Sequence, residues 1–326
     1  MLGKNHSQKI SSSFLARLSR VQKQLAVIDH DLSLYEGKGH QQAQPHSTIS
    51  KINKQASQKG IIKSKKAVHG TQEWAEHNLN IQKGCENSCL YCFARTNKGR
   101  FKKEYKNDWD KPVLRNKIID KGYRKVNGRY MFPTTHDIVP ANLKHYIKVL
   151  NKLVEVGNEV LIVSKPHYSC IKSICNEFKA FKKQIMFRFT IGSTNNETLK
   201  FWETNAPSFT ERLKALRYAH QQGYQTSVSA EPMLDTNMDA LVRAVKPCVS
   251  ETIWLGRINN LRLALSLNVP GNKEAFKKAE ALLSAQSDEW VMELYKRYKD
   301  DPKISWKDSI KKVVGLKRPT KKGLDV

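Results

Sequence analysis

Residues 83–95 read KGCENSCLYCFAR, and this short stretch holds three of the six cysteines in the 326-residue chain. The spacing is C-x3-C-x2-C, and the cysteines are Cys85, Cys89 and Cys92. Three thiolates on one loop can bind three irons of a [4Fe–4S] cluster and leave the fourth iron open. Zinc sites usually have four protein ligands, so zinc would need one more here, from His77 or His136. The loop therefore predicts a metal centre and favours an iron–sulfur cluster over zinc.

An alternation of β-type and helical segments begins at this loop. The β-type runs are Leu79–Gln82, Arg129–Thr134, Glu159–Ser164, Ile185–Ile191, Gln225–Ala230 and Thr252–Gly256, and the helical stretches are roughly 141–155, 168–182, 208–222 and 237–247. Each helix is long enough for a right-handed crossover, so parallel strands are expected. The pattern predicts an α/β fold, a partial (β/α)6 TIM-type barrel with its chemistry at the C-terminal strand ends. A doubly wound open sheet is the alternative, but no GxGxxG motif follows the first strand.

The two ends of the chain differ from this middle part. Residues 10–30 have apolar residues at helical spacing, and residues 36–70 are rich in Gly, Gln, Ser, His and Lys. We therefore expect a basic N-terminal helix and linker over 1–70 and a barrel core over 71–265. The remaining residues, 266–326, are expected to form a helical extension with a lysine-rich tail.

The chain carries 57 Lys and Arg against 30 Asp and Glu, a formal net charge of +27. Residues 93–130 alone hold 13 basic and 4 acidic residues, and six aromatic residues lie among them: Phe93, Phe101, Tyr105, Trp109, Tyr123 and Tyr130. Basic side chains that reach phosphates and aromatic rings that stack on nucleobases are typical of nucleic-acid binding. The alternative is a solvated lysine-rich loop whose rings pack beneath the barrel.

Other features of the sequence bear on its location. No apolar run is long enough to cross a bilayer, and the first residues lack the apolar core of a signal peptide. Six cysteines are too few for a disulfide scaffold. We therefore expect a cytoplasmic protein without a membrane anchor. Cys170, Cys175 and Cys248 are expected to be packing residues.

Around the cysteine loop the sequence resembles the radical SAM superfamily, and within it the spore photoproduct lyase-like branch, also called DNA repair photolyase-like. The resemblance covers about residues 78–260 and rests on an ordered series of motifs. Besides the cysteine triplet with Tyr91, these are MFPTTHDIV at 131–139, VLIVSK at 160–165, FRFTI at 187–191 and WETNAPS at 202–208.

The resemblance implies a cofactor pair, a [4Fe–4S] cluster held by the three cysteines and S-adenosylmethionine (SAM) chelated to the open iron. Reductive cleavage of SAM would give a 5′-deoxyadenosyl radical that abstracts hydrogen from substrate, with the electron supplied by a flavodoxin- or ferredoxin-like reductant. Together with the charge, this predicts nucleic acid as the substrate, for repair or modification. The alternatives are a radical SAM enzyme acting on protein or a small molecule, and a non-catalytic, zinc-stabilised nucleic-acid-binding module.

The resemblance also implies roles for single residues. The cofactor-binding candidates are Tyr91, Lys165, Thr190 and Ser193, and the catalytic candidates are His136, Asp137 and Glu231. Each has a structural alternative: Lys165 could be a solvated strand-end charge, Asp137 a helix cap, His136 a structural histidine, and Glu231 the partner of a basic residue. Glu203 and Arg212 are expected to form an ion pair.

Three departures separate the chain from this branch. Thr134 stands where the lyase has a hydrogen-donating cysteine, so photodimer reversal by the same mechanism is not expected. Glu231 replaces a small apolar residue, and the basic N-terminal 70 residues have no counterpart.

Overall fold

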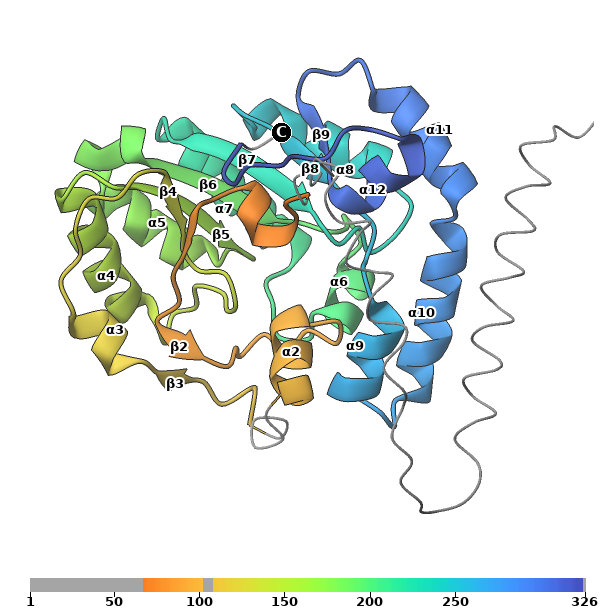
Figure 1. The fold of residues 1–326 in the computed structure, drawn as a ribbon, viewed down its shortest axis with the longest axis horizontal. Helices are drawn as coiled ribbons and strands as arrows, with labels where there is room; N and C mark the ends of the chain where they lie inside the picture. The colour runs from red at the N-terminus through yellow and green to blue at the C-terminus, as the bar shows by residue number, and fades with distance from the viewer. Residues whose placement is uncertain (1–66, 102–107, 325–326) are drawn as a thin grey trace, which may run out of the picture. The chain divides into compact units, whose positions relative to one another are not determined.

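The computed structural model describes residues 67–101 and 108–324, all within one compact unit, Lys65–Val326 (Figure 1). The predicted N-terminal helix, nearly all of the linker and Tyr105 lie outside the described residues. The elements in chain order are η2 (Gly70–Glu73), β1 (His77–Asn78), β2 (Gln82–Lys83), α2 (Phe93–Phe101), β3 (Val113–Leu114), α3 (Asn116–Asp120), β4 (Arg129–Met131), α4 (Leu143–Glu155), β5 (Glu159–Ser164), α5 (Tyr168–Glu177), η4 (Lys179–Gln184), β6 (Ile185–Thr190), α6 (Asn196–Trp202), α7 (Phe209–Gln221), β7 (Gln225–Ala230), α8 (Met238–Val245), η5 (Lys246–Cys248), β8 (Ile253–Leu255), α9 (Leu261–Asn268), α10 (Lys273–Ala285), α11 (Asp288–Tyr298), β9 (Ile304–Trp306) and α12 (Asp308–Val314).

The main sheet has seven strands in the order β1-β4-β5-β6-β7-β8-β9, and every neighbouring pair is parallel. This confirms the predicted α/β fold, a partial TIM-type barrel. Within the described residues no strand pairing joins β1 to β9, so the sheet is not a closed barrel. Because the strands are parallel, their C-terminal ends meet at one edge, and the loops that follow them lie close together.

Side-chain alternation gives the sheet two different faces. In β5, Val160 and Ile162 pack in the main hydrophobic core with the covering helices, whereas Leu161 packs in a separate cluster with Trp74 and Trp254. Successive strand residues point to opposite faces, so these two clusters mark the outer and inner faces of the sheet. The helices follow the same logic, since the buried residues of α4 recur at three- and four-residue spacing, at Tyr146, Val149, Leu150, Leu153 and Val154.

A second hydrophobic cluster lies beside the cysteine loop. It joins α6, α9 and α10 through buried residues, and Leu90 and Tyr91 of the loop pack against it. Figure 1 shows α2, α6, α9 and α10 grouped together, apart from the helices that cover the sheet.

The structure corrects several details of the predicted elements. The first strand is His77–Asn78 and not Leu79–Gln82, and the helix predicted at 168–182 is divided into α5 and η4. The segment after residue 266, expected to be helical, also contributes β9, which pairs with β8. No helix among the described residues has the length and apolar character needed to span a membrane.

The C-terminal segment also reaches back to the first described residues. The Val68 N–H donates to Pro319 O (2.7 Å), and the Gly323 N–H donates to Gln72 O (2.9 Å). These bonds join segments about 250 residues apart in the chain.

Candidate active site

The cysteine loop has a backbone held from both sides. Gly84 has a positive φ of 89°, and a Cβ at this position would lie 2.6 Å from Trp109 O. The Cys85 N–H donates to that same carbonyl oxygen (2.8 Å), and the Leu90 N–H donates to Trp202 O (2.9 Å). The glycine is therefore required both by its backbone conformation and by the close approach of Trp109.

A distant asparagine holds the far end of the loop. Asn268, the last residue of α9, donates through its amide to Leu90 O (3.0 Å) and Cys92 O (3.2 Å). The Thr96 hydroxyl donates to Cys92 O as well (2.8 Å). These bonds fix the start of α2, which begins immediately after Cys92.

The three cysteines form no disulfide in the described part of the chain; Cys85 and Cys89 are buried, and Cys92 is partly exposed. Burial, and after it the charge of Asp137, raises the pKa of Cys85 to about 12. Burial also raises the pKa of Cys89 and Cys92. Since a thiol must lose its proton to bind metal, these sites need a positively charged centre to become thiolates.

The donor set, three cysteine thiols on one loop, is of the type that holds iron–sulfur clusters. In the described part of the chain, no three His, Cys, Asp or Glu side chains are arranged to hold one ion. A cubane binds each thiolate through a different iron, so its ligands need not converge on one point, and thiolate is the ligand type of iron–sulfur centres. The proposed fourth zinc ligands are engaged elsewhere, because His77 Nε2 bonds with Asn127 O (2.9 Å) and both ring nitrogens of His136 face backbone groups.

Asp137 joins the cysteine loop to the ends of β4 and β5. Its carboxylate accepts from Asn87 Nδ2 (2.8 Å), Ser164 Oγ (3.1 Å) and the Lys165 N–H (2.7 Å), and Lys165 Nζ lies 3.4 Å away. Burial acts to raise the pKa of Asp137, but the charge of Lys165 and these hydrogen bonds hold it below its ordinary value. Asp137 is therefore ionised and surrounded by hydrogen-bond donors, a geometry that suits the positioning of Lys165. It does not cap a helix, because α4 begins at Leu143 with Asn142 as its N-cap.

Lys165 is not a solvated strand-end charge. Its side chain is 13% exposed and paired with Asp137. Burial acts to lower the pKa of Lys165, but Asp137, Cys89, Tyr91 and Glu203 raise it well above its ordinary value. A cation therefore lies within the electrostatic reach of the cysteine loop.

Tyr91 connects the loop to a buried ion pair. Its hydroxyl donates to Glu203 Oε1, and Glu203 Oε2 lies 2.5 Å from an Arg212 nitrogen, with both side chains fully buried. Arg212 also donates to Pro207 O (2.8 Å) and Thr190 O (3.2 Å). The expected pair of Glu203 and Arg212 is thus present, and it ties Tyr91 to the end of β6.

The other candidates lie along the same edge of the sheet. Thr190 ends β6, and Ser193 is buried and donates to Asp235. Thr134 accepts from Asn80 Nδ2 (2.6 Å). Burial lowers the pKa of His136 to about 4, so its imidazole is neutral.

Glu231 belongs to a second charged group, on the inner face. Lys307 Nζ lies 3.3 Å from Glu231 Oε2 and 3.0 Å from Glu73 Oε1, and it stands 3.9 Å from the ring centroid of Trp74. Burial raises the pKa of Glu231, although Lys307 opposes this shift. Glu231 is therefore paired with a basic residue, supplied by the C-terminal segment.

Sequence reasoning missed several residues of the site. Asn87, Ser164 and Asn268 bind the loop or Asp137, and Lys307 binds Glu231. Asn87 lies inside the cysteine motif and could have been noticed there. Asn268 and Lys307 carry no local signal, because their contacts are with residues far away in the chain.

Trp109, expected among the stacking rings, is buried, whereas Phe93 is 64% exposed.

Comparison with solved structures finds related folds. The chain is similar to spore photoproduct lyase complexed with dinucleoside spore photoproduct, at 15% identity and a TM-score of 0.48, over 76% of this chain and 80% of that one. A spore photoproduct lyase mutant with bound AdoMet and dinucleoside spore photoproduct gives 14% identity and a TM-score of 0.46, covering 82% and 87% of the two chains. Streptococcus suis SuiB bound to S-adenosylmethionine is similar at 10% identity and a TM-score of 0.44, over 76% of this chain and 54% of that one. No family model and no curated protein matches the chain.

Proposed function

We propose that this chain is a radical SAM enzyme, with nucleic acid as its substrate and an external one-electron reductant. The observation that carries the proposal is the position of three thiols on one braced loop, at the C-terminal edge of a parallel sheet, beside the Lys165–Asp137 pair. Active sites of TIM-type folds lie at this edge. The net charge of +27 supports a polyanionic substrate.

Cys85, Cys89 and Cys92 would hold the cluster. When bound, a [4Fe–4S] cluster would supply the electron that cleaves SAM to methionine and a 5′-deoxyadenosyl radical. The chain's own residues would bind and orient. Lys165 is the cation available for a carboxylate at this edge, and Asp137 holds Lys165 in place through its backbone and side chain.

The residues around the loop would also keep it dry and rigid. Cys85 and Cys89 are each 6% exposed, and Tyr91 is anchored to the buried Glu203. A low-dielectric, preorganised site strengthens the electrostatic contacts made inside it.

The test is anaerobic reconstitution with iron and sulfide, followed by reduction with dithionite in the presence of SAM. We expect bound iron and sulfide, and 5′-deoxyadenosine as a product. Cys89→Ala should lose both, whereas Cys248→Ala is a matched control because Cys248 lies in η5, away from the loop. Retained SAM cleavage in Cys89→Ala would refute the ligand assignment, and bound zinc without SAM turnover would favour the binding module.

A further inference from the structure

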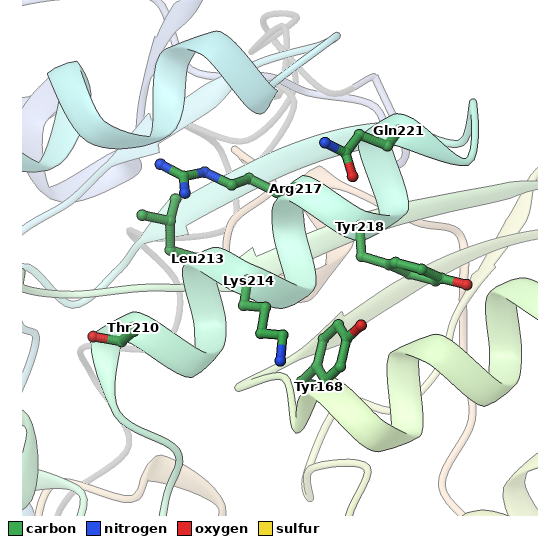
Figure 2. Close-up of a pocket in the computed structure, with 7 residues that line it drawn as sticks. All are labelled: Tyr168, Thr210, Leu213, Lys214, Arg217, Tyr218 and Gln221. Carbon is green, nitrogen blue, oxygen red and sulfur yellow. The ribbon is translucent and has the colours of Figure 1, made fainter.

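A groove lies on the outer face of the molecule between α5 and α7. It has a cavity volume of about 400 Å³, and Figure 2 shows the side chains that line it. The α7 side presents Thr210, Lys214, Arg217 and Gln221 at helical spacing, and Tyr168 and Tyr218 lie across from and beside them. None of the seven lining residues is acidic.

The cations of this face are not neutralised by carboxylates. Among the described residues, no ion pair involves six of the seven Lys and Arg residues of α5, η4 and α7: Lys172, Lys179, Lys182, Lys183, Lys214 and Arg217. The seventh, Arg212, is fully buried and paired with Glu203, so it is not part of this face. Glu211 is engaged with the Tyr168 N–H (3.0 Å) and His167 (3.6 Å). On other helices, basic residues pair with acids, as Arg262 does with Glu280.

The tyrosines give the groove aromatic surface next to its charge. Lys214 Nζ stands 4.0 Å from the ring centroid of Tyr168, and Figure 2 shows it reaching toward that ring. The Tyr168 and Tyr218 rings meet edge to face at 5.8 Å, and the Tyr218 hydroxyl donates to Asn176 (3.0 Å). Lys172 lies between Tyr168 and Asn176 at four-residue spacing, so it belongs to the same face of α5.

The shape of the groove suits an extended ligand. From Thr210 to Gln221, α7 is about 16 Å long at 1.5 Å per residue, longer than a single phosphate group. Past its end, the ammonium of Lys182 lies beside Gly223. At its other end the groove starts near the C-terminal edge of the sheet, where the candidate site lies. Tyr168 follows Lys165 by three residues, and Thr210 precedes Arg212 by two.

We infer that the α5–α7 groove binds the phosphate backbone of a nucleic acid outside the catalytic edge, with Lys214 and Arg217 on phosphates. Unpaired cations, hydrogen-bond donors and aromatic surface without acids are the features that bind a nucleic-acid strand. The inference deepens the proposed function by naming where its substrate is held. Its test reads binding alone, so it fails or succeeds independently of SAM cleavage.

The experiment measures binding of a fluorescent single-stranded DNA of about 20 nucleotides to the full chain, by anisotropy over a series of KCl concentrations. Lys214→Ala/Arg217→Ala is compared with Lys273→Ala/Lys277→Ala, which removes the same charge from exposed positions of α10. We expect the groove variant to bind about tenfold more weakly, and its salt slope to fall by about 1.4, since each phosphate contact contributes about 0.7. The α10 variant should bind like the unmodified chain.

Three results would overturn the inference. These are equal losses in the two variants, full displacement of the DNA by inorganic phosphate or AMP, and displacement by poly-glutamate as effective as by unlabelled DNA. The second would assign the groove to a free phosphate compound and the third to an acidic protein. Both variants change exposed side chains, and unchanged thermal melting would verify that they fold.

Discussion

The Glu203–Arg212 pair provides the sharpest test of how the site is held together. Both side chains are fully buried, and the pair links Tyr91 of the cysteine loop to the end of β6. Arg212→Met would leave the Glu203 carboxylate buried beside Tyr91 without its cation. Removing one partner of a buried pair costs about 3–5 kcal/mol, because the remaining charge has neither water nor a counterion.

Neutralising the remaining partner should recover much of this loss. Glu203→Gln keeps an oxygen for Tyr91 but carries no charge, so the double variant Arg212→Met/Glu203→Gln should be more stable than Arg212→Met alone. We expect a coupling free energy of at least about 1.5 kcal/mol from the double-mutant cycle. The measurement is urea unfolding of all four proteins at pH about 7 and one salt concentration.

An exposed pair serves as the control. Arg262 and Glu280 are 66% and 52% exposed, so Arg262→Ala should leave the free energy of unfolding unchanged within error. The reasoning is refuted if Arg212→Met costs less than about 1 kcal/mol, or if the double variant is as unstable as the two single losses added together. Hydrogen exchange at residues 84–92 should rise in Arg212→Met, since Tyr91 loses its fixed acceptor.

Three further predictions concern pH and backbone conformation. His136 has a folded-state pKa of about 4 against an ordinary 6.5, so the unfolded chain binds the proton more readily. The free energy of unfolding should therefore fall by up to roughly 3 kcal/mol as the pH drops from about 6.5 to about 4. In His136→Gln, the free energy of unfolding measured with urea should depend less on pH over this range. The Lys246 ammonium, 2.5 Å from Asp301, lowers the pKa of that carboxyl from 3.8, so its stabilisation is present above that pH and disappears as pH falls through the lowered value. Asp301→Asn should therefore lose less stability than the unmodified chain between about pH 5 and about pH 3, and an identical loss in acid melting curves would contradict this. Gly84→Ala should destabilise the chain by more than about 1 kcal/mol, since the glycine has φ 89° and its new Cβ would meet Trp109 O; an unchanged melting temperature would show that the loop relaxes.

Much of the fold follows from local patterns in the sequence. The strands β5, β6 and β7 were predicted within one residue of their observed ends, because alternating β-branched runs bounded by helical stretches leave few other arrangements. Helices α4, α7 and α8 were predicted within two residues at each end for the same reason. β9 was missed because a three-residue strand between helices has too little periodicity to be recognised.

The candidate site divides in a similar way. The cysteine spacing and the strand-end positions of Asp137, Lys165 and Glu231 were visible in the sequence, because adjacent residues and the ends of parallel strands need no long-range information. Their partners were not visible. Asn268 binds a loop more than 170 residues earlier in the chain, and Lys307 binds Glu231 from a segment expected to be a tail.

The sequence by itself therefore determined the fold class, the order of most strands and the residue types at the candidate site. Only the tertiary structure decided which charges are paired, which rings are buried and where an outer groove remains unneutralised. The physical reason is that periodicity and motif spacing are local properties of the chain. The pairing of Glu203 with Arg212 depends on which distant segments the folded chain brings together. The same holds for Lys214 and Arg217, which form no ion pair within the part of the chain that the structure describes.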